Sequence, residues 1–209
     1  PLTYSLMVIG SLSLMGFPFL TGFYSKDLIL EVSYSMFLVD ARFVYWIGAV
    51  SAFFTAYYSI RLLYLTFLTK SNGSKTIIEK AHEGSWIMLI PLLILAFGSI
   101  FLGYIFKDLM VGFGSSFFAD TIYSHYTDTL NGEFLPHYIK MIPVIFSLFG
   151  ACLAFMLYFY FMPWVATVKT TILKKVYHFL SSKWYFDVLY NKFIGLPIFK
   201  FGYNVTYLL

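Results

Sequence analysis

The sequence is poor in charge and in cysteine. Only 11% of its 209 residues are charged, against about a quarter in a soluble domain, whereas 60% are hydrophobic and 22% are aromatic. The single cysteine, Cys152, lies inside an apolar run, which excludes a disulfide framework and a cysteine-based metal site. The four histidines have no metal-ligand spacing. This composition is that of an integral membrane protein.

Sequence motifs for enzymatic chemistry are also missing. We find no phosphate-binding glycine loop, no G-x-S-x-G and no H-E-x-x-H, so the chain shows no chemistry on bound substrates. The net charge of +4 does not indicate nucleic-acid binding, because the basic residues fall in the connections between apolar runs. The sequence opens on Pro1 without a signal peptide, and we expect it to be an internal piece of a longer protein.

The apolar runs predict an all-α integral membrane fold. We expect a transmembrane region, 1–163, that contains about four spans at 2–39, 43–68, 85–106 and 141–163. An amphipathic basic segment, 164–209, should follow it, with an apolar end that is too short to cross the membrane.

The first apolar run is too long for one straight span. A helix over residues 2–39 would extend about 57 Å, whereas the hydrocarbon core is about 30 Å thick. Pro18 removes a backbone donor and disfavours helix at the preceding residue, so we predict a non-helical break within 17–25. Ser25 is then expected to cap a second half-helix, with Asp27 in its first turn.

Lysines indicate the orientation in the membrane. Connection 69–83 and segment 164–183 are rich in lysine and lie two spans apart, hence on one side. Connection 114–139 is acidic and contains no Lys or Arg before Lys140. The positive-inside rule therefore predicts that the two lysine-rich segments face the matrix or cytoplasm and that 114–139 faces the opposite side.

The candidate functional residues are charges inside or beside apolar runs. Lys26, Asp27 and Glu31 follow the predicted break, and a charge at the bilayer centre costs about 3 kcal/mol. Asp27 and Glu31 share one helix face at i,i+4, whereas Lys26 points elsewhere. Arg61 is a secondary candidate, as a fixed positive charge near a water path. For Lys26 and Arg61 the alternative is an anchor that extends to the membrane surface.

Four segments resemble a known family. They are Gly16–Glu31 (GFPFLTGFYSKDLILE), Tyr57–Leu63 (YYSIRLL), Gly103–Met110 (GYIFKDLM) and Lys183–Asp187 (KWYFD). They resemble the subunit 5 family of mitochondrial NADH dehydrogenase, the proton-pumping subunits of respiratory complex I. The resemblance covers nearly the whole chain, and its first segment is the most specific.

The resemblance implies a part of an antiporter-like helical bundle, in which each of two inverted repeats holds a broken transmembrane helix. It implies that Lys26 is the lysine of the outlet half-channel and Asp27 its acidic neighbour. Segment 164–209 would lead to a lateral helix that the chain lacks. The implied function is proton translocation across the mitochondrial inner membrane, driven by quinone reduction elsewhere in the complex.

The resemblance also implies partners and cofactors. The chain would be a multi-pass subunit of the proton-translocating NADH:ubiquinone reductase without a redox centre of its own. Flavin, iron–sulfur clusters and quinone would belong to other subunits. Its partners would be other membrane-arm subunits, lipids, and a separate chain or further segment that supplies the upstream helices. Two alternatives remain: a subunit of a multi-subunit cation/proton antiporter, or a non-transporting membrane scaffold.

Overall fold

A computed structural model describes residues 1–36, 39–70, 73–111, 115, 117, 132, 134–171 and 173–208. Over these ranges the secondary structure is helical and contains no strand, as expected for an all-α membrane fold. The chain divides into two compact units, Pro1–Tyr160 and Phe161–Leu209. Most of the acidic connection 114–139 lies outside the described residues.

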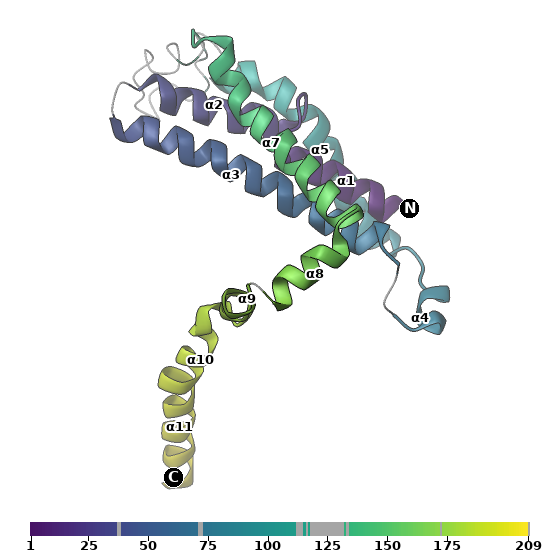
Figure 1. The fold of residues 1–209 in the computed structure, drawn as a ribbon, viewed down its shortest axis with the longest axis vertical. Helices are drawn as coiled ribbons and strands as arrows, with labels where there is room; N and C mark the ends of the chain where they lie inside the picture. Colours follow the sequence, from purple (N-terminus) through teal and green to yellow (C-terminus); the bar gives the residue numbers. More distant parts are fainter. Residues whose placement is uncertain are drawn as a thin grey trace. The chain divides into compact units, whose positions relative to one another are not determined.

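The first unit is a bundle of long helices (Figure 1). Its elements are α1 (Leu2–Met15), α2 (Thr21–Ser35), α3 (Val39–Leu63) with a π-helical continuation (Tyr64–Leu68), α4 (Lys75–Glu79), α5 (Trp86–Val111) and α7 (His137–Phe159). Three described helices are long and apolar enough to cross a membrane, namely Asp40–Leu68, Trp86–Met110 and His137–Phe159. The last begins before the expected 141–163 and ends earlier, because Pro163 belongs to the next helix, where a proline fits the first turn.

The second unit consists of short helices. They are α8 (Met162–Thr170), α9 (Lys174–Ser181), a 3₁₀ turn (Lys183–Tyr185), α10 (Phe186–Tyr190), a π-helical turn (Asn191–Gly195) and α11 (Leu196–Leu208). The three residues of the 3₁₀ turn have positive φ, which bends the chain there. α11 has 13 residues and extends about 20 Å, short of the membrane core of about 30 Å.

Small residues allow α3 and α7 to pack closely. Ala49, Ala52 and Ala56 on α3 are fully buried, as is Ala154 on α7. A Cβ atom on Gly150 would collide with the backbone carbonyl of Phe53. Close approach through small residues is how transmembrane helices pair without a hydrophobic driving force.

A buried tyrosine completes the contact between α3 and α7. Tyr45 is 1% exposed, and its hydroxyl donates to the carbonyl of Ile139 at 2.7 Å. That carbonyl has no helical partner four residues later, because Pro143 carries no N–H. The tyrosine hydroxyl therefore replaces the hydrogen bond that the proline removes, and Leu30 of α2 packs in the same cluster.

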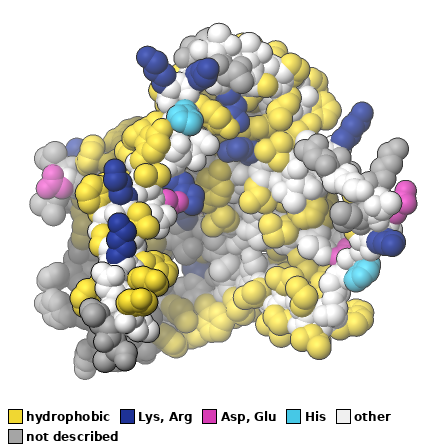
Figure 2. Space-filling view, turned by 90° about the horizontal axis from the view of Figure 1, so that it is seen from below, with side chains coloured by type: hydrophobic (Ala, Val, Ile, Leu, Met, Phe, Trp, Pro, Cys, Tyr) yellow, Lys and Arg dark blue, Asp and Glu magenta, His cyan; other side chains and the backbone are white. Residues whose placement is uncertain are grey.

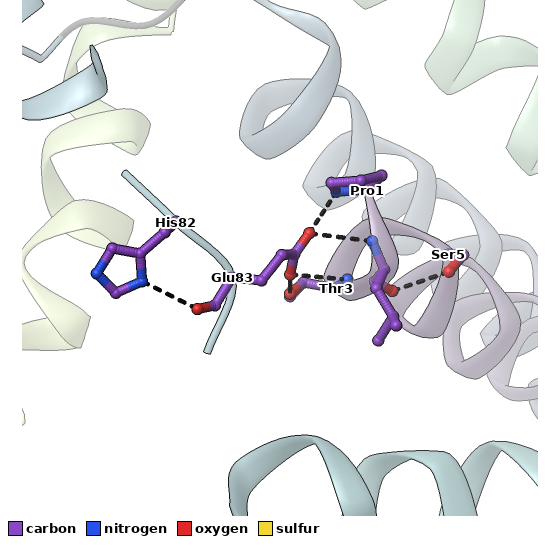
Figure 3. Close-up of polar contacts among 6 residues, drawn as sticks. Pro1, Thr3, Ser5, His82 and Glu83 are labelled. Carbon is purple, nitrogen blue, oxygen red and sulfur yellow. Dashed lines mark hydrogen bonds and ion pairs between the residues drawn. The ribbon is translucent and has the colours of Figure 1, made fainter. Parts of the chain in front are cut away.

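Glu83 binds the start of α1 from the connection that precedes α5 (Figure 3). Its carboxylate accepts the amides of Leu2, at 3.0 Å, and Thr3, at 3.3 Å, and also the Thr3 hydroxyl. These are orphan donors of the first helical turn. Glu83 therefore satisfies donors at the beginning of α1 from a connection about 80 residues away in the chain.

The surface of the molecule is largely apolar. Figure 2 shows broad hydrophobic areas, with Lys and Arg side chains at separate places between them. On α5, Ile87 is 84% exposed and Leu95 is 68% exposed. Exposed apolar surface of this extent is typical of a chain that lies among lipids and other helices, and it agrees with a membrane protein.

Candidate functional site

The site is built around a break between α1 and α2. α1 ends at Met15 and is capped by Gly16, whose φ of +79° is left-handed. The amide of Gly16 donates to Ser13 at 3.1 Å and that of Phe17 to Leu12 at 3.0 Å, the two bonds of a Schellman motif. Residues 16–20 are not helical, which confirms the predicted break. Pro18 follows the glycine cap, as prolines commonly do, and does not itself interrupt a helix.

The two half-helices can cross the membrane only together. α1 has 14 residues and α2 has 15, so each extends about 21–23 Å, less than the hydrocarbon core of about 30 Å. A pair that crosses as one span places the break at membrane depth. Non-helical backbone at that depth is found where it is buried in protein or lines a cavity.

α2 begins earlier than the sequence suggests, because neighbouring helices bind its first turn. The Thr21 hydroxyl donates to the carbonyl of Gly98 and accepts the amide of Gly103 on α5, each at 2.9 Å. The amide of Gly22 donates to the Ser13 hydroxyl of α1 at 3.2 Å. The prediction that Ser25 caps α2 with Asp27 in its first turn is therefore wrong. Ser25 lies inside the helix and donates to the carbonyl of Gly22.

Lys26 reaches back across the break to the end of α1. Its Nζ donates to the carbonyl of Met15 at 3.5 Å, and its aliphatic stem lies against Gly16. The last carbonyls of a helix carry partial negative charge, so a cation is favoured there. Pro143 and Ser147 of α7 close the other side of this gap, which is too narrow to admit a water molecule. The half-buried lysine is thus enclosed by three helices.

Asp27 connects this closed gap to an open cavity. The cavity has a volume of about 300 Å³, and it is lined by Phe23, Tyr24, Asp27, Leu28, Glu31, Lys107 and Lys140. Asp27 also lines the gap that holds Lys26. Glu31 lies one turn further along the same face of α2, as the i,i+4 spacing predicts. A proton that leaves Lys26 by way of Asp27 would therefore enter a space with room for water.

Lys140 and Glu31 form an ion pair at this cavity, and Lys140 was not among the predicted site residues. Lys140, in the first turn of α7, lies 3.3 Å from the Glu31 carboxylate, and their side chains are 24% and 16% exposed. The available signal was that Lys140 is the first basic residue after an acidic connection and stands where the fourth span starts. Lys107, on α5, lies over the Tyr24 ring at 5.9 Å on the same cavity.

Arg61 does not join these residues. Its guanidinium lies over the Tyr158 ring at 5.8 Å, and its side chain is exposed. At 1.5 Å per residue, Arg61 is about 24 Å along α3 from Tyr45, which packs beside α2. The structure therefore gives Arg61 no place in the cluster around Lys26. Among the described residues, no group of His, Cys, Asp and Glu could hold a metal ion.

The arrangement suits the movement of a proton. The gap and the cavity together are lined by two carboxylates, Asp27 and Glu31, and by three cations, Lys26, Lys107 and Lys140. Lys26 and Asp27 line the gap at the helix break, and Asp27 also lines the open cavity. Intramembrane ionisable residues of both signs, placed at a broken helix, are typical of ion pathways.

Comparison with known proteins identifies two family matches. Residues 58–208 match the family described as NADH dehydrogenase subunit 5 C-terminus. Residues 1–55 match the family described as NADH:quinone oxidoreductase/Mrp antiporter, TM. The break, Lys26, Asp27 and Glu31 fall in the second match, whereas α5, α7 and the second unit fall in the first.

Several curated relatives are similar over 99% of this chain. NADH-ubiquinone oxidoreductase chain 5 of Phytophthora infestans is 51% identical over 210 residues, and 32% of that protein is covered. The proteins of the same name from Schizophyllum commune and Marchantia polymorpha are 47% and 44% identical, with 31% and 32% of their lengths covered. The chain thus spans about a third of the length of the curated relatives that it matches.

Proposed function

Because this chain belongs to the family of NADH dehydrogenase subunit 5, we propose that it forms the exit part of a proton path. The path crosses the mitochondrial inner membrane in respiratory complex I, where quinone reduction in other subunits drives it. Lys26 and Asp27 carry the proton in this proposal, and Glu31 is a secondary group of the path. Arg61 has no role in it.

The observation that carries the proposal is the double position of Asp27. It lines the dry gap around Lys26 and also the cavity that has room for water. In the proposed step, an N–H bond of the Lys26 ammonium breaks and an O–H bond forms on the Asp27 carboxylate. Lys26 becomes a neutral amine and Asp27 a carboxylic acid. Asp27 then releases the proton to water in the cavity and is a carboxylate again, and Lys26 must take up a new proton before the next transfer.

The chemistry of this chain's residues supports the assignment of redox groups to other subunits. A cluster of the ordinary iron–sulfur type requires four cysteine ligands, and the sequence has one. We therefore propose that iron–sulfur clusters are bound elsewhere in the complex, and we propose the same for flavin and quinone. The proposed partners are other membrane-arm subunits, lipids, and the polypeptide segment that corresponds to the upstream part of the relatives.

Two other functions remain as competitors. A subunit of a cation/proton antiporter without a redox partner would share the broken helix, and the family that matches residues 1–55 includes antiporters by its description. The match over 58–208 names only NADH dehydrogenase subunit 5, which favours the respiratory complex. A non-transporting scaffold would hold the same helices together, but it gives Lys26 no task.

Substitution of Lys26 separates proton transport from a scaffold role. In the intact complex, Lys26→Met keeps the side-chain length but removes the titratable group, so proton pumping should fall while the subunit still assembles. Electron transfer should slow as well, if pumping and quinone reduction are tightly coupled. Lys175→Met is a matched control, because it makes the same change at an exposed lysine of α9. Normal pumping by an assembled Lys26→Met complex would leave Lys26 as an anchor and would support the scaffold.

A further inference from the structure

We propose that Lys140 is a positioning residue for proton release. By its ion pair with Glu31, it keeps that carboxylate ionised, so that the cavity does not retain the proton that Asp27 delivers. This inference rests on the proposed function of Lys26 and Asp27, and it adds a residue from a different helix, α7.

The geometry places Lys140 on the release side of Asp27. Lys140, Glu31 and Asp27 line the same cavity, and Glu31 is the carboxylate that Lys140 contacts. The 3.3 Å separation of Lys140 and Glu31 is that of a direct ion pair, and both side chains are at least three-quarters buried. A pair that is shielded in this way is screened by solvent much less than a surface pair. Its charge therefore acts on the neighbouring carboxylate.

Without Lys140, two carboxylates would lie one helical turn apart at the cavity. Neighbouring like charges make it unfavourable for both groups to be ionised, so such a pair tends to share and hold one proton. A proton held by Asp27 and Glu31 blocks the next transfer from Lys26. The ammonium of Lys140 offsets one of the two negative charges, and the site can then empty before the next proton arrives.

Among the described residues, the other charges near the two carboxylates do not replace Lys140. On the described elements, the titratable groups that face them are Lys26 and Tyr34 on α2, Tyr45 on α3, Lys107 on α5 and Lys140 on α7. Lys26 is itself the proton donor, and the hydroxyl of Tyr45 is bound to Ile139. Lys107 is exposed and lies over the Tyr24 ring. Lys140 is the cation that contacts Glu31 directly.

The test is the pH dependence of proton pumping in the intact complex. Lys140→Met should move the acidic limb of the pumping profile to higher pH by about one to three units, the usual effect of losing an opposite charge within 4–6 Å. Lys140→Arg keeps the charge and should restore the original limb. Lys175→Met should leave the limb where it is in the unaltered complex.

Three outcomes would overturn the inference. They are an unchanged profile in an assembled Lys140→Met complex, a loss of pumping by the same factor at every pH, and a failure of Lys140→Arg to restore the limb. A structural role for Lys140 predicts the second outcome. If Lys140→Met does not assemble, Lys140→Gln takes its place, because it keeps a donor for Glu31 without the charge, and it must show the same shift.

Pumping by the Lys26→Met complex tests the proposed function separately from the role of Lys140. If Lys26→Met impairs pumping but Lys140→Met has a normal profile, the proton path stands and only the role of Lys140 falls. If Lys26→Met pumps normally, the proposed function falls as well. The two variants alter different helices, so neither result follows from the other.

Discussion

Tyr45→Phe should destabilise the bundle by an amount that depends on Pro143. The change removes one hydroxyl that is buried and donates to the Ile139 carbonyl at 2.7 Å. Because Pro143 offers no N–H, that carbonyl would lose its donor, and a buried unsatisfied acceptor costs about 1–3 kcal/mol. The free energy of unfolding should fall by this amount.

A double-mutant cycle tests the reasoning. Pro143→Ala restores an N–H that can donate to the Ile139 carbonyl, so Tyr45→Phe should cost much less in that background. The stability of the full-length subunit in detergent, followed by circular dichroism, gives the four values. An equal cost of Tyr45→Phe with proline or alanine at position 143 would refute the link between the two residues.

Two further predictions concern packing and topology. Gly150→Leu should separate α3 from α7, because its side chain meets the Phe53 backbone, and overpacking costs about 1–3 kcal/mol or more. The matched control Gly10→Leu, where a Cβ meets open space, should leave thermal stability unchanged or slightly raised in the same melting assay. The lysine distribution predicts that 69–83 and 164–183 face the matrix. Proteolysis of sealed mitoplasts should then cut 114–139 from the outer side, and cleavage from the matrix side alone would contradict this orientation.

Local sequence signals predicted the break but not its limits. Excess length and Pro18 indicated an interruption, and the glycine cap at Gly16 lies beside it. The first residue of α2 is set by hydrogen bonds to a distant helix, α5, which a local sequence pattern cannot indicate. Thr21 is bound by backbone groups of α5, 77 and 82 residues away in the chain, whereas a serine cap at Ser25 was the better local motif. Tertiary hydrogen bonds thus overrode capping preference.

The candidate site was predicted only in part, because local sequence patterns do not show contacts between residues that are far apart in the chain. Lys26, Asp27 and Glu31 are adjacent in sequence, so their charge within an apolar run identified them together. Lys140 comes from a helix 109 residues later, and only folding brings it to Glu31. Arg61 shows the opposite case, since a charge in an apolar span fits a path by composition but lies beside Tyr158. Hydropathy identifies charged residues within apolar runs, but it does not show which of them lie in contact in the folded chain.

The central claim is that Lys26 must lose and regain a proton. Lys26→Arg tests it most directly, because arginine keeps the positive charge and the length needed to reach Met15 but does not release a proton at accessible pH. The measurement is the number of protons moved per NADH oxidised by the intact complex. The account predicts that this ratio, or the turnover itself, falls sharply with arginine. A normal ratio at normal turnover would show that a fixed charge suffices and would contradict the account.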